Sequence, residues 1–167
     1  MKPMLWKIGA GSRTMAARTS HHFGYVLIGA IGFALLTQAV PYWRDRMAMA
    51  DWVSATLSII PAGEGPPVIG YDYTATRDVE AEWRAFVEDA RGNRLSASYL
   101  GNGRYRTIRG GYREWSWEAF FEADPGPRVP RVPFRVCVQY YVTAATGVTQ
   151  DTGPFCSEAF NPMEARP

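Results

Sequence analysis

The sequence predicts a mainly β protein in which a single N-terminal transmembrane helix is followed by an antiparallel β-sandwich. Three observations support this prediction. One uncharged apolar run lies near the N-terminus, alternation of apolar and polar residues recurs through the rest of the chain, and turn-forming residues separate the alternating stretches. With 167 residues, 14% of them aromatic, the chain has enough apolar material beyond the helix for one folded domain.

The apolar run covers residues 23–40 and continues without charge to residue 43. About 18 helical residues measure ~27 Å, which approaches the ~30 Å hydrocarbon thickness of a bilayer. We therefore expect a transmembrane signal-anchor helix over residues 23–43, with the lipid bilayer as its partner. Ala30 and Ala34 form a small-xxx-small pair, which is compatible with a homo-oligomer through this helix.

Charge is distributed unevenly around the apolar run. Residues 1–22 carry four cations and no acid, whereas residues 44–167 carry 14 arginines, no lysine and 16 acidic residues. The positive-inside rule then places the N-terminus in the cytoplasm and the C-terminal part outside it, although Arg44 and Arg46 weaken the bias. The expected location is the inner (cytoplasmic) membrane with a periplasmic or extracellular domain, or a host membrane if the chain is phage-encoded.

Cleavage of the anchor is the alternative to its retention. Residues 48–50, Ala-Met-Ala, precede Asp51 and have the small-x-small form of a signal-peptidase site. Against cleavage stand the long basic N-terminal region, an apolar run above the usual ~7–15 residues, and the charges directly after the run. We favour the retained anchor, with cleavage after Ala50 left open.

The chain is expected to contain five segments. They are a short basic cytoplasmic tail (1–22), the transmembrane helix (23–43), a linker (44–51), the β-sandwich domain (52–162) and a disordered C-terminus (163–167). Only the sandwich segment is long enough to form a hydrophobic core.

Two half-buried strands open the domain. Their apolar faces consist of Val53, Ala55, Leu57 and Ile59 in the first, and of Ile69, Tyr71, Tyr73 and Ala75 in the second. The intervening PAGEGPP is rich in turn-forming residues and separates the two strands.

Residues 76–92 fit both a helix and a strand. A helix would group Val79, Trp83, Phe86 and Ala90 on one face, with Gly92 as a C-cap. In a strand, the residues that face inward would be Val79, Ala81, Trp83, Ala85 and Val87. We favour the strand because a turn at 91–93 and a second alternating run through Leu95, Ala97 and Tyr99 would complete a hairpin.

Three stretches lead to the last hairpin. Residues 101–113 are glycine-rich and basic, which indicates an exposed irregular strand or loop. Residues 114–121 alternate as a strand, with Trp115, Trp117, Ala119 and Phe121 on one face. Residues 124–133 contain four prolines, so we expect an extended crossover between the sheets.

The last hairpin carries the most specific structural prediction. Residues 132–142 alternate strongly, and a turn at Thr146 and Gly147 would place Cys137 directly opposite Cys156. Cross-strand Cβ atoms ~4.5–5.5 Å apart approach the geometry that a disulfide needs. We expect this disulfide, which suits an oxidising compartment, with two free buried thiols as the alternative.

About seven short strands and a tryptophan on an early central strand are typical of immunoglobulin-like and fibronectin type III-like sandwiches. The likeness is architectural. The cysteine pair would lock a single hairpin, whereas antibody domains bridge two sheets.

The sequence contains few residues in patterns typical of a catalytic site. No histidine lies beyond residue 22, which excludes Ser-His-Asp and Cys-His schemes and the usual zinc sites. No nucleotide-binding or metal-carboxylate motif occurs, so we expect no catalytic residues, metal or cofactor. Glu80, Glu82 and Glu88 alternate on one strand face and offer the only basis for a carboxylate-only envelope hydrolase.

A basic and aromatic cluster is the candidate contact surface. It consists of Arg104, Tyr105, Arg106, Arg109, Tyr112 and Arg113. Arginine and tyrosine can pair with or stack on phosphates, lipid head groups or an acidic protein face. Nucleic acid is not expected as a partner because acidic residues outnumber basic ones beyond the helix. The alternative is an edge strand guarded by charge.

The expected function is a non-enzymatic protein-binding or structural module of the cell envelope, with a protein partner there. The main alternative is a phage-type lysis-accessory protein, in which the transmembrane helix itself is the active part.

Overall fold

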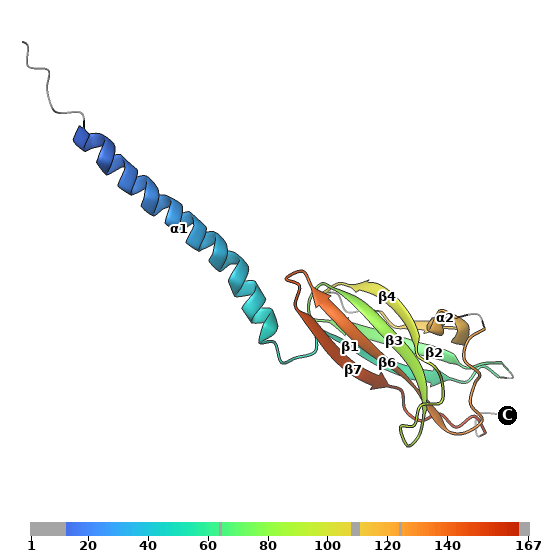
Figure 1. Cartoon of the computed structure of the whole chain (residues 1–167). Helices are drawn as coiled ribbons and strands as arrows, with labels where there is room; N and C mark the ends of the chain where they lie inside the picture. The colour runs from blue at the N-terminus through green and yellow to red at the C-terminus, as the bar shows by residue number, and fades with distance from the viewer. Residues whose placement is uncertain (1–12, 64, 108–110, 124, 164–167) are drawn as a thin grey trace, which may run out of the picture. The chain divides into compact units, whose positions relative to one another are not determined.

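The structure is a computed structural model that describes residues 13–63, 65–107, 111–123 and 125–163. The chain divides after Arg44 into two compact units, one helical and one a β-domain (Figure 1). Most of the expected N-terminal tail, up to residue 12, lies outside the described residues, as do the last four residues of the chain.

Helix α1 spans Arg13–Arg46 and therefore extends beyond the expected helix at both ends. Within it, Gly24–Arg46 has a mean hydropathy of 1.6, and its most apolar window is not buried inside the structure. The predicted N-terminal apolar helix is thus present, with the length and composition of a membrane anchor or a signal sequence.

The β-domain consists of two antiparallel sheets, which confirms the mainly β prediction (Figure 1). One sheet has the order β1-β2-β5, with β1 at Val53–Ile60, β2 at Val68–Ala75 and β5 at Arg113–Trp115. The other has the order β4-β3-β6-β7, with β3 at Val79–Asp89, β4 at Tyr99–Tyr105, β6 at Phe134–Ala144 and β7 at Thr149–Cys156.

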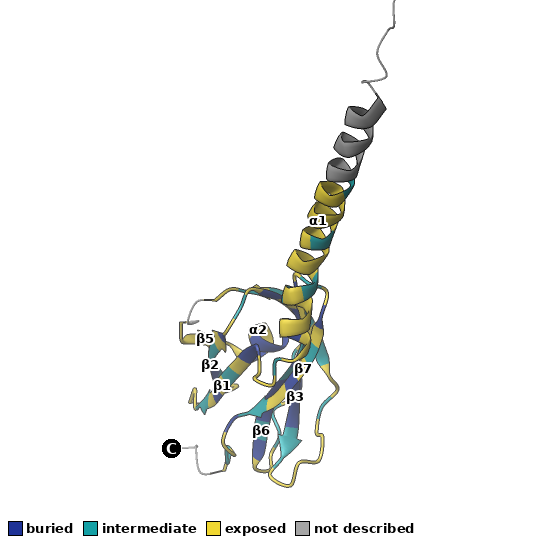
Figure 2. Ribbon diagram, turned by 90° about the vertical axis from the view of Figure 1, so that its left-hand side faces the viewer, coloured by how far each residue is buried: buried dark blue, intermediate teal, exposed yellow. Residues whose placement is uncertain are grey.

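Apolar side chains from both sheets meet in one core. Trp52, Trp117 and Tyr140 are its largest fully buried side chains. The inward faces expected for the first two strands lie in this core, where Val53 and Ile69 are fully buried. Figure 2 shows buried positions on β3, β6 and α2, in contrast to the exposed surface of α1.

Strand β3 settles the ambiguity at residues 76–92 in favour of the strand. It pairs with β4 on one side and with β6 on the other. The expected inward residues Val79, Ala81, Ala85 and Val87 are buried, while Trp83 is partly buried. Pairing on both edges satisfies the backbone and buries one apolar face, which outweighs the helical pattern of the segment.

The return strand of this hairpin begins later than the sequence predicts. Regular pairing was expected from Leu95, but β4 begins at Tyr99 and runs through the glycine-rich stretch. Before it, the Ser96 hydroxyl accepts a hydrogen bond from the Val87 backbone N–H at 3.0 Å. A side chain thus replaces a backbone acceptor and delays the regular ladder.

The prediction of one continuous strand over 114–121 is wrong. Helix α2 occupies Trp117–Phe121. Ser116 caps this helix, since its side chain accepts a hydrogen bond from the backbone N–H three residues later at 3.2 Å. Residues four apart share one helix face, so the first and last residues of α2 are both buried, whereas Trp115 is 38% exposed.

The proline-rich stretch crosses between the sheets, as predicted. It leads from α2, which follows β5 of the first sheet, to β6 of the second. The indole N–H of Trp117 donates a hydrogen bond to the Pro127 carbonyl at 2.5 Å. This bond holds the stretch against the core.

Strands β6 and β7 form the expected hairpin, but their register changes along its length. The pairing near the turn, if continued, would place Cys137 opposite Phe155. A β-bulge beyond Tyr140 adds one residue to β7 and brings Cys156 opposite Cys137 instead. Gly153, with φ of 93°, supplies the backbone conformation at this place. The predicted register is therefore wrong near the turn and correct at the cysteines.

The segment expected as a linker, residues 44–51, joins the β-domain from Asp45 onward. The Asp45 side chain is 5% exposed and accepts hydrogen bonds from Arg77 and Thr146. The compact unit that contains the sheets therefore begins at Asp45, within the segment expected as a linker.

Candidate functional site

The expected contact cluster lies along one side of the β-domain. Strands β1 and β7 contact each other at one side, so β5 and β4, at the other ends of their sheets, form the opposite side. We name this side the β4–β5 edge, comprising residues 99–106 and 112–115. It holds Arg104, Tyr105, Arg106, Tyr112 and Arg113, while Arg109 lies outside the described residues.

Arg104 faces solvent and has an acidic partner. Its guanidinium forms an ion pair with Glu80 at 3.1 Å, and both side chains are largely exposed. Exposed pairs of this kind typically contribute less than about 1 kcal/mol to folding. This ion pair is therefore typical of a solvent-exposed edge strand and contributes little to stability.

Arg106 also has an acidic neighbour, Asp78. The Asp78 carboxylate accepts hydrogen bonds from the Thr107 backbone N–H at 2.7 Å and from its hydroxyl at 2.8 Å. These hydrogen bonds lower the pKa of Asp78, and the charge of Arg106 adds to the effect. The β4–β5 edge is therefore mixed in charge and not a strongly basic patch.

Tyr105 points inward, unlike the surface residue that the sequence pattern indicated. Its ring meets Tyr73 edge-on, with centroids 5.0 Å apart, and Tyr140 edge-on at 5.4 Å. Such perpendicular pairs are a favourable aromatic geometry. Tyr105 therefore belongs to the wall of an interior cavity instead of an outer contact surface.

This cavity has a volume of about 130 Å³ and lies between the two sheets at the β4–β5 edge. Strands β2 to β6 and helix α2 all contribute to it. Its aromatic lining consists of Tyr71, Trp83, Tyr105, Trp115, Phe120 and Tyr140. We name it the aromatic pocket.

Three of the residues that line the aromatic pocket are tyrosines, which carry polar hydroxyl groups. The hydroxyls of Tyr71 and Tyr140 form a hydrogen bond of 2.7 Å. Burial raises the pKa of Tyr71, Tyr105 and Tyr140 above the usual value for tyrosine. These side chains are therefore neutral at physiological pH.

Glu122 adds an acidic side chain to the lining of the aromatic pocket. It follows α2 in the left-handed conformation, with φ of 48°, and its backbone N–H donates to the Ala119 carbonyl at 3.3 Å. This helix-ending conformation sets the direction in which its side chain leaves the backbone.

Trp83 is held in place by a glycine on the neighbouring strand. Gly101 pairs with Trp83 across β3 and β4. A Cβ at Gly101 would overlap the six-membered ring of Trp83, so only glycine lets the indole lie flat against the strand. The absence of a side chain at Gly101 is thus required for the packing of Trp83.

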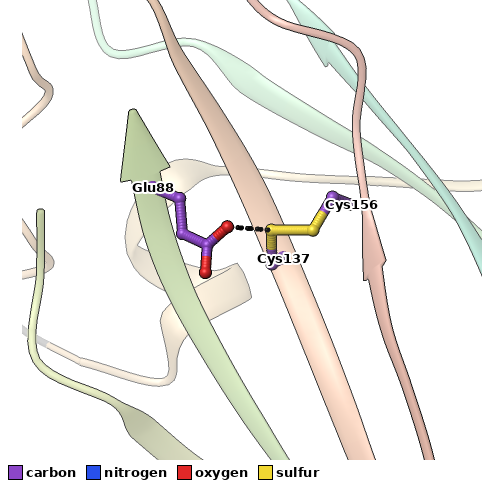
Figure 3. A group of neighbouring side chains, drawn as sticks. All are labelled: Glu88, Cys137 and Cys156. Carbon is purple, nitrogen blue, oxygen red and sulfur yellow. Dashed lines mark hydrogen bonds between the residues drawn. A yellow bond between two sulfur atoms is a disulfide. The ribbon is translucent and has the colours of Figure 1, made fainter. Parts of the chain in front are cut away.

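The two cysteines are joined by a disulfide with an S–S distance of 2.05 Å. Figure 3 shows Glu88 of β3 pointing toward it. A disulfide sulfur carries no proton, so the 3.7 Å contact between Glu88 Oε2 and Cys137 Sγ is not a donated hydrogen bond. Thiolate is the sulfur species that binds metals, and the bonded pair offers none. Glu88 instead faces Arg135, at 3.7 Å.

The aromatic pocket could not be predicted from the sequence. Tyr71 and Trp83 were assigned inward positions, but nothing in their spacing indicated that they share a cavity with α2 and β6. One available signal was the high content of tyrosine and tryptophan at inward positions, because both carry a polar atom that a plain core does not need.

Comparison of this chain with protein-family models, with curated proteins and with solved structures found no match.

Proposed function

We propose that this chain is a single-pass membrane protein that displays its β-domain outside the cytoplasm as a non-enzymatic binding module of the cell envelope. The main observation in support of this proposal is the apolar surface of helix α1. Its apolar side chains are exposed along the segment Gly24–Arg46, for example Val26 at 70% and Phe33 at 71%. A helix that is apolar all round is stable when a bilayer covers it.

The charge pattern and the disulfide support an extracytoplasmic β-domain. Four cations and no acid precede the apolar run, which favours a cytoplasmic N-terminus. The disulfide between Cys137 and Cys156 lies in the other unit, and disulfides persist in oxidising compartments. The two features are independent and favour the same orientation.

The β4–β5 edge supports a binding role. Edge strands present backbone groups to which a partner can add a strand. Leu100 and Tyr112 are 67% and 56% exposed there. Exposed apolar and aromatic side chains are typical anchors of a protein-binding surface.

Membrane insertion and orientation are tested together. We expect the full chain to resist alkaline carbonate extraction, and alkaline phosphatase fused after residue 163 to be active. Ile31→Arg with Leu35→Arg should release the chain, because each charge opposes insertion by about 2.5–3.5 kcal/mol. Asp51→Arg is the control, since it adds a cation outside the apolar run. Extraction of the unchanged protein would contradict the proposal.

The lysis-accessory alternative predicts a different result. A binding module should leave the membrane potential of expressing cells unchanged, because its helix serves only to anchor it. Measurement with a potential-sensitive dye distinguishes the two. A fall in potential that disappears in Ala30→Leu with Ala34→Leu would favour the alternative, since these changes block close helix approach.

A further inference from the structure

We propose that the aromatic pocket binds a methylated ammonium group, such as the head of choline. The proposal rests on the role of the β-domain as a binding module. It does not depend on how helix α1 is oriented in a membrane.

The lining of the pocket has the composition of a cation cage. Six aromatic rings surround a single cavity, and they come from β2, β3, β4, β5, β6 and α2. The face of an aromatic ring carries negative electrostatic potential and attracts a cation within about 6 Å of its centroid. Methylated ammonium groups are the ligands that such cages recognise in general.

The charge of the pocket lining is opposite to that of a cationic ligand. Among the described residues that line it, Glu122 is the only charged one, and it is acidic. The hydroxyls of Tyr71, Tyr105 and Tyr140 remain neutral, and no arginine lies among the described residues that line the pocket. An organic cation would therefore meet aromatic rings and, at the solvent-exposed side of the pocket, the carboxylate of Glu122.

The size of the cavity limits the ligand. A volume of about 130 Å³ compares with the ~150 Å³ of a cavity that holds one benzene molecule. A trimethylammonium group is in this range. A longer ligand would extend toward solvent beside Trp115, which is 38% exposed.

The cage is formed in advance of binding. Trp83 lies against the backbone of Gly101, and Tyr105 is wedged edge-on between Tyr73 and Tyr140. Rings held in this way lose little freedom when a ligand arrives, which favours affinity. A primary ammonium needs several hydrogen-bond acceptors, whereas ring faces suit a methylated one.

Binding is measured with the full chain in maltoside detergent, which contains no ammonium group. Choline, tetramethylammonium and ethanolamine are titrated by calorimetry, together with 3,3-dimethylbutan-1-ol, the uncharged isostere of choline. We expect saturable binding of the first two and at least about tenfold weaker binding of the isostere and of ethanolamine. Equal binding of choline and its isostere, a preference for ethanolamine, or no saturable binding would overturn the proposal.

Variants locate the ligand in the pocket. Glu122→Gln and Trp115→Ala should each weaken choline binding about tenfold, because each removes one attractive element of the lining. Glu118→Gln is the matched control, an exposed carboxylate on α2 that does not line the cavity. Trp115→Phe keeps a ring and should retain most of the affinity. Equal effects at Glu118 and Glu122, or unchanged binding in Trp115→Ala, would overturn the assignment.

The source of the cation is distinguished in nanodiscs. A lipid head group would compete, so phosphatidylcholine discs should lower the apparent affinity for added choline relative to phosphatidylglycerol discs. Equal affinity in both would support a free solute. If the unchanged protein resists carbonate extraction but does not bind choline, only this inference is contradicted. If it binds choline but is extracted, only the anchored topology is contradicted.

Discussion

Asp45 and Arg77 form an ion pair on the β-domain although 32 residues separate them. The other carboxylate oxygen of Asp45 accepts a hydrogen bond from the Thr146 hydroxyl at 2.7 Å. The Arg77 guanidinium also lies over the Trp52 ring, 4.5 Å from its centroid. This network makes the segment before β1 part of the folded domain.

Asp45→Ala should destabilise the β-domain by about 2–4 kcal/mol, because it leaves a partly buried guanidinium without its carboxylate. The free energy of unfolding is measured by denaturant titration of the full chain in detergent, followed by tryptophan fluorescence. Asp51→Ala is the control, since Asp51 is an exposed acid in the same segment and should change stability by less than about 0.5 kcal/mol. Equal losses in the two variants would contradict the role of the ion pair.

The anchor should remain attached in the mature protein. Cleavage after Ala50 would remove Asp45 from its buried site, together with the hydrogen bond from the Gln150 side chain to the Ala50 carbonyl at 3.1 Å. Mass spectrometry of the intact protein should therefore give the full 18.7 kDa. A mass that lacks residues 1–50 would show that the β-domain folds without this network.

Removal of the disulfide should lower stability by about 3 kcal/mol, since the bond closes a loop of nearly 20 residues in the unfolded chain. The variant is Cys137→Ala with Cys156→Ala, and the readout is again the free energy of unfolding. The unchanged protein treated with dithiothreitol should match it. Peptide mapping without reductant should recover the two cysteines in one linked peptide, and two free thiols would contradict the assignment.

Gly101→Ala should destabilise the domain by about 1–3 kcal/mol, because the added Cβ on β4 would overlap the indole of Trp83, which belongs to β3, and displace it. The loss of fixed indole packing should also weaken the near-ultraviolet circular dichroism. Gly103→Ala is the matched control on the same strand, where the Cβ would meet the nearest atom, in Tyr105, at an ordinary 3.5 Å. Similar losses in both would indicate a general effect of strand glycines.

Stability should decline above about pH 10 because of the buried tyrosines. Burial raises the pKa of Tyr71, Tyr105 and Tyr140 in the folded state, while the unfolded chain ionises near pH 10. Their contribution is complete below that pH and is lost as the pH rises toward the folded pKa values. The triple phenylalanine variant should show a shallower decline between pH 10 and 12, and an unchanged slope would contradict this origin.

Local patterns predicted much of the fold. The apolar helix, the strands around Val53 and Ile69, and the proline-rich crossover all follow from periodicity or from the limits that proline places on the backbone. The choice of a strand for residues 76–92 needed the neighbouring turn as a second observation. These features could be predicted because each depends on residues close together in the chain.

Pairing and packing between distant segments decided the remainder. Cys137 faces Cys156 only because a β-bulge shifts the register of β7 by one residue. Such a bulge cannot be predicted from the alternation of apolar and polar residues. Tyr105 turned inward, and α2 replaced a strand, because burial against the opposite sheet outweighed local pattern. The sequence by itself thus determined an apolar helix and a two-sheet β-domain. Only the tertiary structure brought six rings and Glu122 around one cavity, because they come from separate strands and a helix whose approach no local spacing encodes.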